Sequence, residues 1–245
     1  MGVMSDSFTG QLWCDIEDIY AAILAHPFVA GLADGTLPRE AFEFYVLQDA
    51  LYLRKYAQAL AAVGSRAPDT AATEMFARHA AGIVSAELEL HRTLFTQLGI
   101  DPASLAVTAE APTTLAYTSY LLAATFNGSY AEGVGAVLPC YWIYAEVGKH
   151  LLERGSPNPH YQQWIDTYGG EEFGDEAGEV IAVTDKLAAE ITPTERERVR
   201  GHFRATSRYE WMFWDMGYRQ EQWPLFSQTP LRQTPLRQTP LRQTP

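Results

Sequence analysis

The sequence contains only two cysteines, Cys14 and Cys140, in 245 residues. Two cysteines build no disulfide framework, and reduced thiols are typical of the cytoplasm. Residues 1–10 hold no basic stretch followed by an apolar one, so they lack the pattern of a secretory signal peptide. No apolar run approaches the roughly 18 to 20 residues that a membrane-spanning helix needs. We therefore expect a soluble cytoplasmic protein.

Positive charge is also scarce. The chain has 18 lysines and arginines against 30 aspartates and glutamates, a formal net charge of −12. Proteins that bind nucleic acid present a basic surface, so this balance argues against that class. A phosphate-binding loop is missing as well, because Gly133-Val134-Gly135 lacks the remaining glycine and no Gly-Lys-Ser/Thr occurs. The sequence therefore indicates neither a nucleic-acid binder nor a nucleotide-binding enzyme.

Alternating runs of the kind that form strands are missing, whereas helical patterns fill most of the chain. Ser129-Tyr130-Ala131-Glu132 has the pattern of a capping box, and Thr192-Pro193-Thr194-Glu195 adds proline at the first helical position. Gly99 is placed as a C-terminal cap. We predict one all-α domain with a turn at 31–35 and a loop at 101–112. Its helices are expected at about 8–25, 38–63, 68–98, 113–127, 130–155, 159–168, 171–190 and 193–218.

The C-terminal residues differ from the rest. From Gln228 the unit Gln-Thr-Pro-Leu-Arg occurs three times in succession, and Gln243-Thr244-Pro245 follows. A proline in every five residues blocks both a helix and a central strand. The unit is too short and too polar to bury one face, so we expect a disordered tail over 224–245 and a folded domain over 8–223.

The segment Leu138–Glu146 is apolar and aromatic, with one cysteine and one glutamate set into it. Cys140 and Tyr144 are four residues apart and share one face of a helix. A thiol among aromatic rings suits a pocket wall, where Cys140 is a candidate nucleophile. A buried structural cysteine is the alternative, because free cysteine behaves as a small apolar residue.

The helix expected over 38–63 carries Tyr45, Asp49, Tyr52 and Tyr56 on one face. One carboxylate among three phenols is unusual for a core stripe, and a solvated face would carry more charge and fewer rings. The pattern is equally compatible with a recognition site and with a hydrogen-bonded core network.

Glu210 lies in a second aromatic segment, Tyr209–Trp214. Burial among rings would raise the pKa of its carboxyl group and keep it protonated, which is what a general acid needs. The alternative for Glu210 is an ion pair with Arg208 or Arg204.

Two Glu-x-x-x-His pairs, Glu87/His91 and Glu146/His150, resemble the ligand pairs of di-iron bundles, where the usual spacing is Glu-x-x-His. Each pair is explained equally well as a surface helix pair, and we expect no metal site. A Cys–His–Asp/Glu triad at Cys140 is a further alternative, but none of the six histidines lies in a comparably apolar segment.

Taken together, these segments resemble the TenA family, also called thiaminase II or aminopyrimidine aminohydrolase. The resemblance extends from about residue 8 to residue 223, and its elements occur in the family's order. They are His26-Pro27-Phe28, Gly35-Thr36-Leu37-Pro38, Tyr45-Val46-Leu47-Gln48-Asp49, Leu138-Pro139-Cys140-Tyr141-Trp142, Tyr161 through Gly170, and Tyr209-Glu210-Trp211-Met212-Phe213-Trp214.

The resemblance implies an all-α fold like that of haem oxygenase, without haem, usually assembled as a homotetramer. It implies hydrolysis of the C–N bond at the aminomethyl carbon of a pyrimidine, with no metal or organic cofactor. The preferred substrate in the family is 4-amino-5-aminomethyl-2-methylpyrimidine, and thiamin is a further one. The hydroxymethyl pyrimidine product re-enters thiamin synthesis, so the pathway is thiamin salvage.

The family's residue roles carry over to positions of this sequence. They make Cys140 the nucleophile, Glu210 the acid/base, and Asp49 the group that binds the aminopyrimidine. The aromatic positions of the family's pocket correspond to Tyr52, Tyr117, Tyr144, Tyr168 and Phe213.

Two rival classes of function stay open on the same helical frame. Members of this family have been labelled transcriptional regulators, but the acidic charge and the lack of a helix-turn-helix pattern argue against direct contact with DNA. The other rival is a metal-dependent oxygenase.

Overall fold

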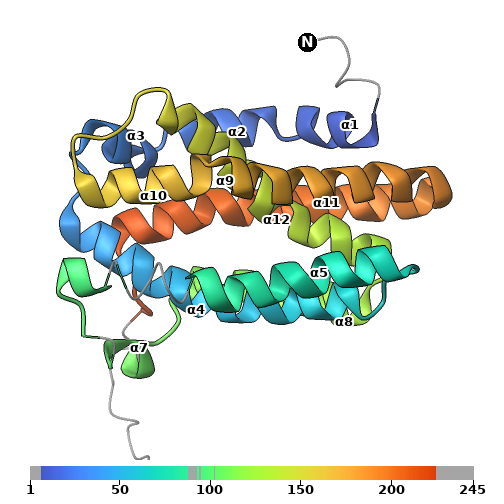
Figure 1. Cartoon of the computed structure of the whole chain (residues 1–245), viewed down its shortest axis with the longest axis horizontal. Coiled ribbons are helices and arrows are strands. Elements are labelled where there is room, and N and C mark those ends of the chain that lie inside the picture. Colours follow the sequence, from blue (N-terminus) through green and yellow to red (C-terminus); the bar gives the residue numbers. More distant parts are fainter. Residues whose placement is uncertain (1–6, 88–92, 94, 102, 225–245) are drawn as a thin grey trace, which may run out of the picture.

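The computed structural model describes residues 7–87, 93, 95–101 and 103–224 (Figure 1). Every regular element in this part of the chain is helical, as predicted, and it contains no strand. None of its helices is long and apolar enough to span a membrane. Of the predicted repeat tail over 224–245, residues 225–245 lie outside the described residues.

The helix α9 (Tyr130–Leu152) is the element around which the others pack. Both bonds of the predicted capping box are present: Ser129 Oγ accepts the Glu132 N–H, and the Glu132 carboxylate accepts the Ser129 N–H at 2.7 Å. Most α9 residues are buried because helices cover it on several sides. These helices are α8 (Pro112–Asn127), α10 (Pro159–Gly169), α11 (Glu171–Glu190) and α12 (Pro193–Arg219).

A second group of helices lies along the lower side in Figure 1, where α4 (Arg39–Gly64) packs against α5 (Thr70–Gly82) and α8. The helix α5 continues into a π-helical turn, Ile83–Glu87. The sequence predicted one helix over 68–98, part of which lies outside the described residues. Its predicted cap is confirmed, because Gly99 has a left-handed φ of 71°.

The predicted helix over 8–25 is wrong in its continuity. The structure has α1 (Phe8–Cys14) and α2 (Glu17–Leu24), separated at Asp15 and Ile16. Ile16 has φ of −124° and is fully buried, while Asp15 pairs with Arg200 of α12. Both contacts are tertiary, so the local pattern did not show the break.

The predicted turn at 31–35 is wrong as well, because it is mostly the helix α3 (Pro27–Asp34). His26 begins this helix by accepting the Phe28 N–H at its Nδ1 atom, at 3.1 Å. Only Gly35 is left-handed, with φ of 70°. Gly31 serves packing instead, since a Cβ there would lie 2.9 Å from the Leu37 backbone nitrogen.

Smaller differences concern helix ends. The expected loop over 101–112 contains a short helix, α7 (Ser104–Val107), and α8 begins at Pro112. Pro38 precedes α4 as its N-cap and is not its first helical residue. The predicted end of α9 at Gly155 is three residues late, and Gly155 is the left-handed residue that follows it, with φ of 66°.

Contact between α9 and α10 depends on Gly148. A Cβ at Gly148 would lie 2.4 Å from the Tyr168 carbonyl carbon and 2.5 Å from the Gly169 backbone nitrogen. Only a glycine lets the two backbones approach this closely. The close approach fixes the position of Tyr168 relative to α9.

We predict that Gly148→Ala destabilises the protein by about 1 to 3 kcal/mol, the usual cost of overpacking. The matched control is Gly201→Ala in α12, where no atom lies within 4 Å of an added Cβ. That change should stabilise the protein by about 0.5 to 1 kcal/mol, because glycine weakens a helix interior. Urea denaturation of both variants measures the two effects. Equal stability of the variants would contradict the packing role of Gly148.

Candidate active site

A cavity of about 200 Å³ lies between α4, α9, α10 and the start of α11. The structure brings five of the predicted site residues together in its wall, and each side chain is at most 8% exposed. They are Asp49, Tyr52, Cys140, Tyr144 and Tyr168. These five residues contribute one carboxylate, one thiol and three phenol rings to the wall of a space the size of a small planar molecule.

The tyrosine and aspartate stripe on α4 divides between the cavity and the core. Asp49, Tyr52 and Tyr56 line the cavity. Tyr45 lies deeper, where its ring stacks on Trp214 at 5.4 Å and its hydroxyl lies 3.1 Å from the Tyr144 hydroxyl. Tyr56 donates a hydrogen bond to the Val137 carbonyl at 2.8 Å. The stripe therefore contributes both to the cavity wall and to a hydrogen-bonded core.

Cys140 comes from the most deeply buried stretch of α9 and opens into the cavity beside Tyr141 and Tyr144. The Tyr144 ring packs against Tyr168 of α10 at 5.1 Å. Aromatic faces thus enclose the thiol from two helices. The other cysteine, Cys14, is an exposed free thiol.

Glu210, Tyr117 and Phe213 are not among the residues that line the cavity, but they lie directly beside its wall. Tyr117 donates a hydrogen bond from its hydroxyl to Glu210 Oε1. The rings of Tyr117 and Phe213 pack against Tyr52 at 5.0 and 5.3 Å. These three predicted site residues therefore form a second layer that contacts the cavity through Tyr52.

The alternative of an ion pair for Glu210 is wrong. Glu210 is 1% exposed, whereas Arg204 and Arg208 lie on the exposed side of α12. The hydrogen-bond donor to Glu210 is the neutral phenol of Tyr117.

The surroundings of Glu210 favour its protonated form. The pKa of the Glu210 carboxyl group is raised from 4.5 to about 8: burial is the largest cause, the Tyr117 hydrogen bond lowers the pKa, and the nearby Asp49 carboxylate raises it. A carboxyl group with such a pKa holds its proton at neutral pH. Burial also raises the pKa values of Tyr52 and Tyr117 well above 10, so both phenols stay neutral.

Sequence reasoning missed several residues of the cavity wall. Tyr56 and Tyr141 were noted only as parts of their segments, although Tyr56 is one helical turn from Tyr52 and Tyr141 directly follows Cys140. Other missed residues come from the π-helical turn and from α11, which no local pattern links to Cys140. They are Ile83, Glu172, Phe173 and Glu176.

The metal alternative finds no support in the described part of the chain. It holds no group of three or more histidine, cysteine, aspartate or glutamate side chains placed to share an ion. Glu146 pairs with Lys149 at 2.9 Å. The side chains of Glu87 and His91 lie outside the described residues.

Comparisons with known proteins identify the family to which the chain is similar. The model of the TENA/THI-4/PQQC family matches residues 13–220. The chain is similar to an aminopyrimidine aminohydrolase of Bacillus subtilis (strain 168), with 41% identity over 198 residues, 81% of this chain and 84% of that protein.

Solved structures show the same fold. A TenA homologue from P. horikoshii OT3 superposes with a TM-score of 0.81 at 32% identity, covering 87% of this chain and 99% of its own. A domain with a haem oxygenase-like fold from Shewanella denitrificans OS217 superposes with a TM-score of 0.69 over 86% of this chain and 92% of its own. At 16% identity the second likeness concerns the fold alone.

The raised pKa of Glu210 predicts a particular dependence of stability on pH. Between the ordinary value of 4.5 and about 8, folded Glu210 keeps a proton that the unfolded chain has lost. The free energy of unfolding should therefore fall as pH rises through this range, by up to about 1.4 kcal/mol per pH unit. Glu210→Gln removes this titration, so the variant should gain stability relative to wild type as pH rises. The measurement is the free energy of unfolding from urea denaturation at several pH values in this range. If this free energy changed with pH in the same way for wild type and Glu210→Gln, a protonated Glu210 would be contradicted.

Proposed function

The chain belongs to the TENA/THI-4/PQQC family, and from this premise we propose that it hydrolyses the C–N bond at the aminomethyl carbon of thiamin-derived aminopyrimidines. The substrates are 4-amino-5-aminomethyl-2-methylpyrimidine and thiamin, and the product is the hydroxymethyl pyrimidine of thiamin salvage. The observation that carries the proposal is the cavity itself, where Cys140 and Asp49 share an aromatic wall backed by Glu210.

Binding uses the shape and polarity of the cavity. An aminopyrimidine is flat, so the rings of Tyr52, Tyr144 and Tyr168 suit its faces. Its edge carries an amino group that donates hydrogen bonds, and the Asp49 carboxylate accepts them. This arrangement leaves the exocyclic carbon directed to the remaining wall, which includes Cys140.

Cys140 is the proposed nucleophile. Its thiolate adds to an electron-poor ring carbon, and the electron pair returning from the ring expels the leaving group at the exocyclic carbon. Water then adds to that carbon, and the bond from sulfur to the ring breaks to restore the aromatic ring and the thiolate. The step needs a reduced cysteine, which a cytoplasmic location maintains.

Glu210 is the proposed acid/base. An amine leaves only after it receives a proton, and the raised pKa of Glu210 keeps that proton available at neutral pH. Once Glu210 has given up its proton, it can take one from the attacking water. Tyr117 holds the carboxyl group in place through its hydrogen bond.

We also propose a homotetramer. Several large apolar side chains in the described part of the chain are exposed, and burying them between copies is a common reason for assembly. They include Val107, Phe126 and Trp223, which are 85%, 64% and 49% exposed.

The deciding experiment is the release of ammonia from the aminomethyl pyrimidine by wild type and by Cys140→Ser. We predict that Cys140→Ser folds normally and loses nearly all turnover, because an alkoxide is much harder to form at neutral pH than a thiolate. A variant that kept more than about a tenth of the wild-type rate would rule out covalent catalysis. A wild-type protein that released no ammonia and bound DNA would favour a regulator instead.

Glu210→Gln separates binding from turnover. We predict near-native affinity for the pyrimidine and turnover that is about 10²- to 10⁴-fold slower, the usual contribution of a positioned general acid. In wild type the rate should fall as pH rises past about 8, where Glu210 loses its proton, and this alkaline limb should vanish in the variant. Native turnover by the variant would remove Glu210 from the chemistry.

A further inference from the structure

A chain of three hydrogen-bonded side chains leaves the cavity and has no role in the mechanism above. The Tyr141 hydroxyl lies 3.1 Å from His79 Nδ1. His79 Nε2 lies 2.8 Å from Glu179 Oε2. The carboxylate of Glu179 accepts two further bonds from one Arg78 nitrogen, at 2.8 and 2.9 Å. The side chains come from α9, α5 and α11, so tertiary packing brings them together.

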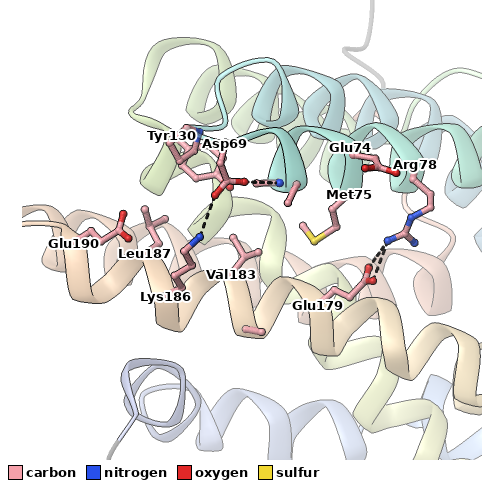
Figure 2. A pocket seen from close by; sticks show the side chains of 14 residues that line it. Asp69, Glu74, Met75, Arg78, Tyr130, Glu179, Val183, Lys186, Leu187 and Glu190 are labelled. Atoms are coloured by element: carbon pink, nitrogen blue, oxygen red, sulfur yellow. Dashed lines mark hydrogen bonds and ion pairs between the residues drawn. The ribbon is translucent and has the colours of Figure 1, made fainter.

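The two ends of this chain open into different spaces. Tyr141 lines the cavity that also holds Cys140. Glu179 lines a groove of about 640 Å³ on the surface between α5 and α11. Figure 2 shows Glu179 and Arg78 joined at one end of this groove. His79 lies between the two spaces and is 1% exposed, so the three side chains connect the cavity with the surface.

The chain has a fixed hydrogen-bond direction. The Arg78 bond lowers the pKa of Glu179, so its ionised carboxylate only accepts. His79 must then donate from Nε2. Burial lowers the pKa of His79, with Arg78 and Glu179 as the charges that act on it, so the ring is neutral and Nδ1 accepts. Tyr141 therefore donates its hydroxyl proton to Nδ1, and each bond points from the cavity towards the surface.

The proposed reaction releases a proton with one class of substrate only. With an amine substrate, no proton is left over in the site, because Glu210 gives its proton to the amine and regains one from water. Thiamin differs, because its leaving group is a quaternary thiazolium nitrogen that departs as a neutral thiazole with the electron pair of the broken bond. Water then supplies the hydroxyl group of the product, and one proton is left over in each turnover.

We propose that Tyr141, His79 and Glu179 carry this extra proton from the cavity to the surface groove. Water in the cavity gives its proton to the Tyr141 oxygen as the Tyr141 proton passes to His79 Nδ1, and the Nε2 proton passes to Glu179 and then to solvent. This inference rests on the proposed function and adds a specificity determinant to it. The three side chains support cleavage of quaternary substrates and are dispensable for amines.

The state of Glu210 agrees with this division of work. With thiamin it has no amine to protonate, so it keeps its proton at neutral pH and cannot act as a base. The Asp49 carboxylate is occupied by the aminopyrimidine edge, and the other carboxyl groups of the wall are those of Glu172 and Glu176 on α11. Transfer through Tyr141 needs no charged group in the aromatic wall, since the charge that forms on His79 lies beside Glu179.

The molecule also contains a matched control. Tyr120, His202 and Glu132 repeat the same order of groups: Tyr120 Oη lies 2.9 Å from His202 Nδ1, and His202 Nε2 lies 3.8 Å from Glu132. Arg198 pairs with Glu132 at 3.1 Å. Tyr120 does not line the cavity. Replacing His202 therefore removes a histidine with the same kind of partners and leaves the proposed proton path unchanged.

The experiment measures turnover of thiamin and of the aminomethyl pyrimidine by wild type, His79→Gln and Glu179→Gln. The controls are His202→Gln and Glu190→Gln, since Glu190 lies on the same helix and groove as Glu179. We expect the ratio of thiamin turnover to amine turnover to fall about 10²-fold in both path variants, the lower range for a positioned proton-transfer group. The controls should keep the wild-type ratio, and KM values should not change.

The outcomes separate this inference from the proposed function. Wild type that cleaves neither substrate overturns both, and wild type that cleaves only the amine overturns the proton path alone. Equal losses on the two substrates, or an unchanged ratio, would assign His79 a structural role. Glu179→Gln keeps the test decisive if His79→Gln fails to fold, because Glu179 is 43% exposed and its replacement leaves the core intact.

Discussion

Burial of α9 is the constraint on which the rest of the structure depends. A helix covered on several sides has no solvated face. A neighbouring helix can then approach it closely only where α9 has a small residue. Gly135 meets Val199 of α12, and Gly148 meets the backbone at Tyr168 of α10. These two contacts hold α10 and α12 at fixed distances from Cys140.

Two carboxyl groups, those of Asp49 and Glu210, lie in the aromatic interior, and their surroundings differ. Asp49 lines the cavity, where a substrate edge can bind its charge. Glu210 lies one layer deeper with Tyr117 as its donor, and burial together with the Asp49 charge favours its proton. In the proposed reaction, the different depths of the two carboxyl groups separate an anion that binds substrate from an acid that donates a proton.

The sequence predicted the helical class, most helix starts and the cavity-lining positions Asp49, Tyr52, Cys140, Tyr144 and Tyr168. Local rules suffice for helix starts, because a capping box is complete within four residues. Local patterns singled out Asp49, Tyr52, Cys140 and Tyr144, but their grouping with Tyr168 in one site came from the family resemblance, because no local rule joins α4 to α10. The break at Ile16 and the helix after His26 were missed for the same reason, since tertiary contacts decide them.

The two tyrosine–histidine–glutamate chains show why composition alone does not assign a role. Both contain the same groups in the same order, each with an arginine at the carboxylate. One begins at Tyr141 in the wall beside Cys140, and the other begins at Tyr120, outside that wall. Each chain joins side chains from different helices, so the sequence alone does not distinguish the two. Their difference is therefore a property of the fold, since Tyr141 lines the cavity and Tyr120 does not.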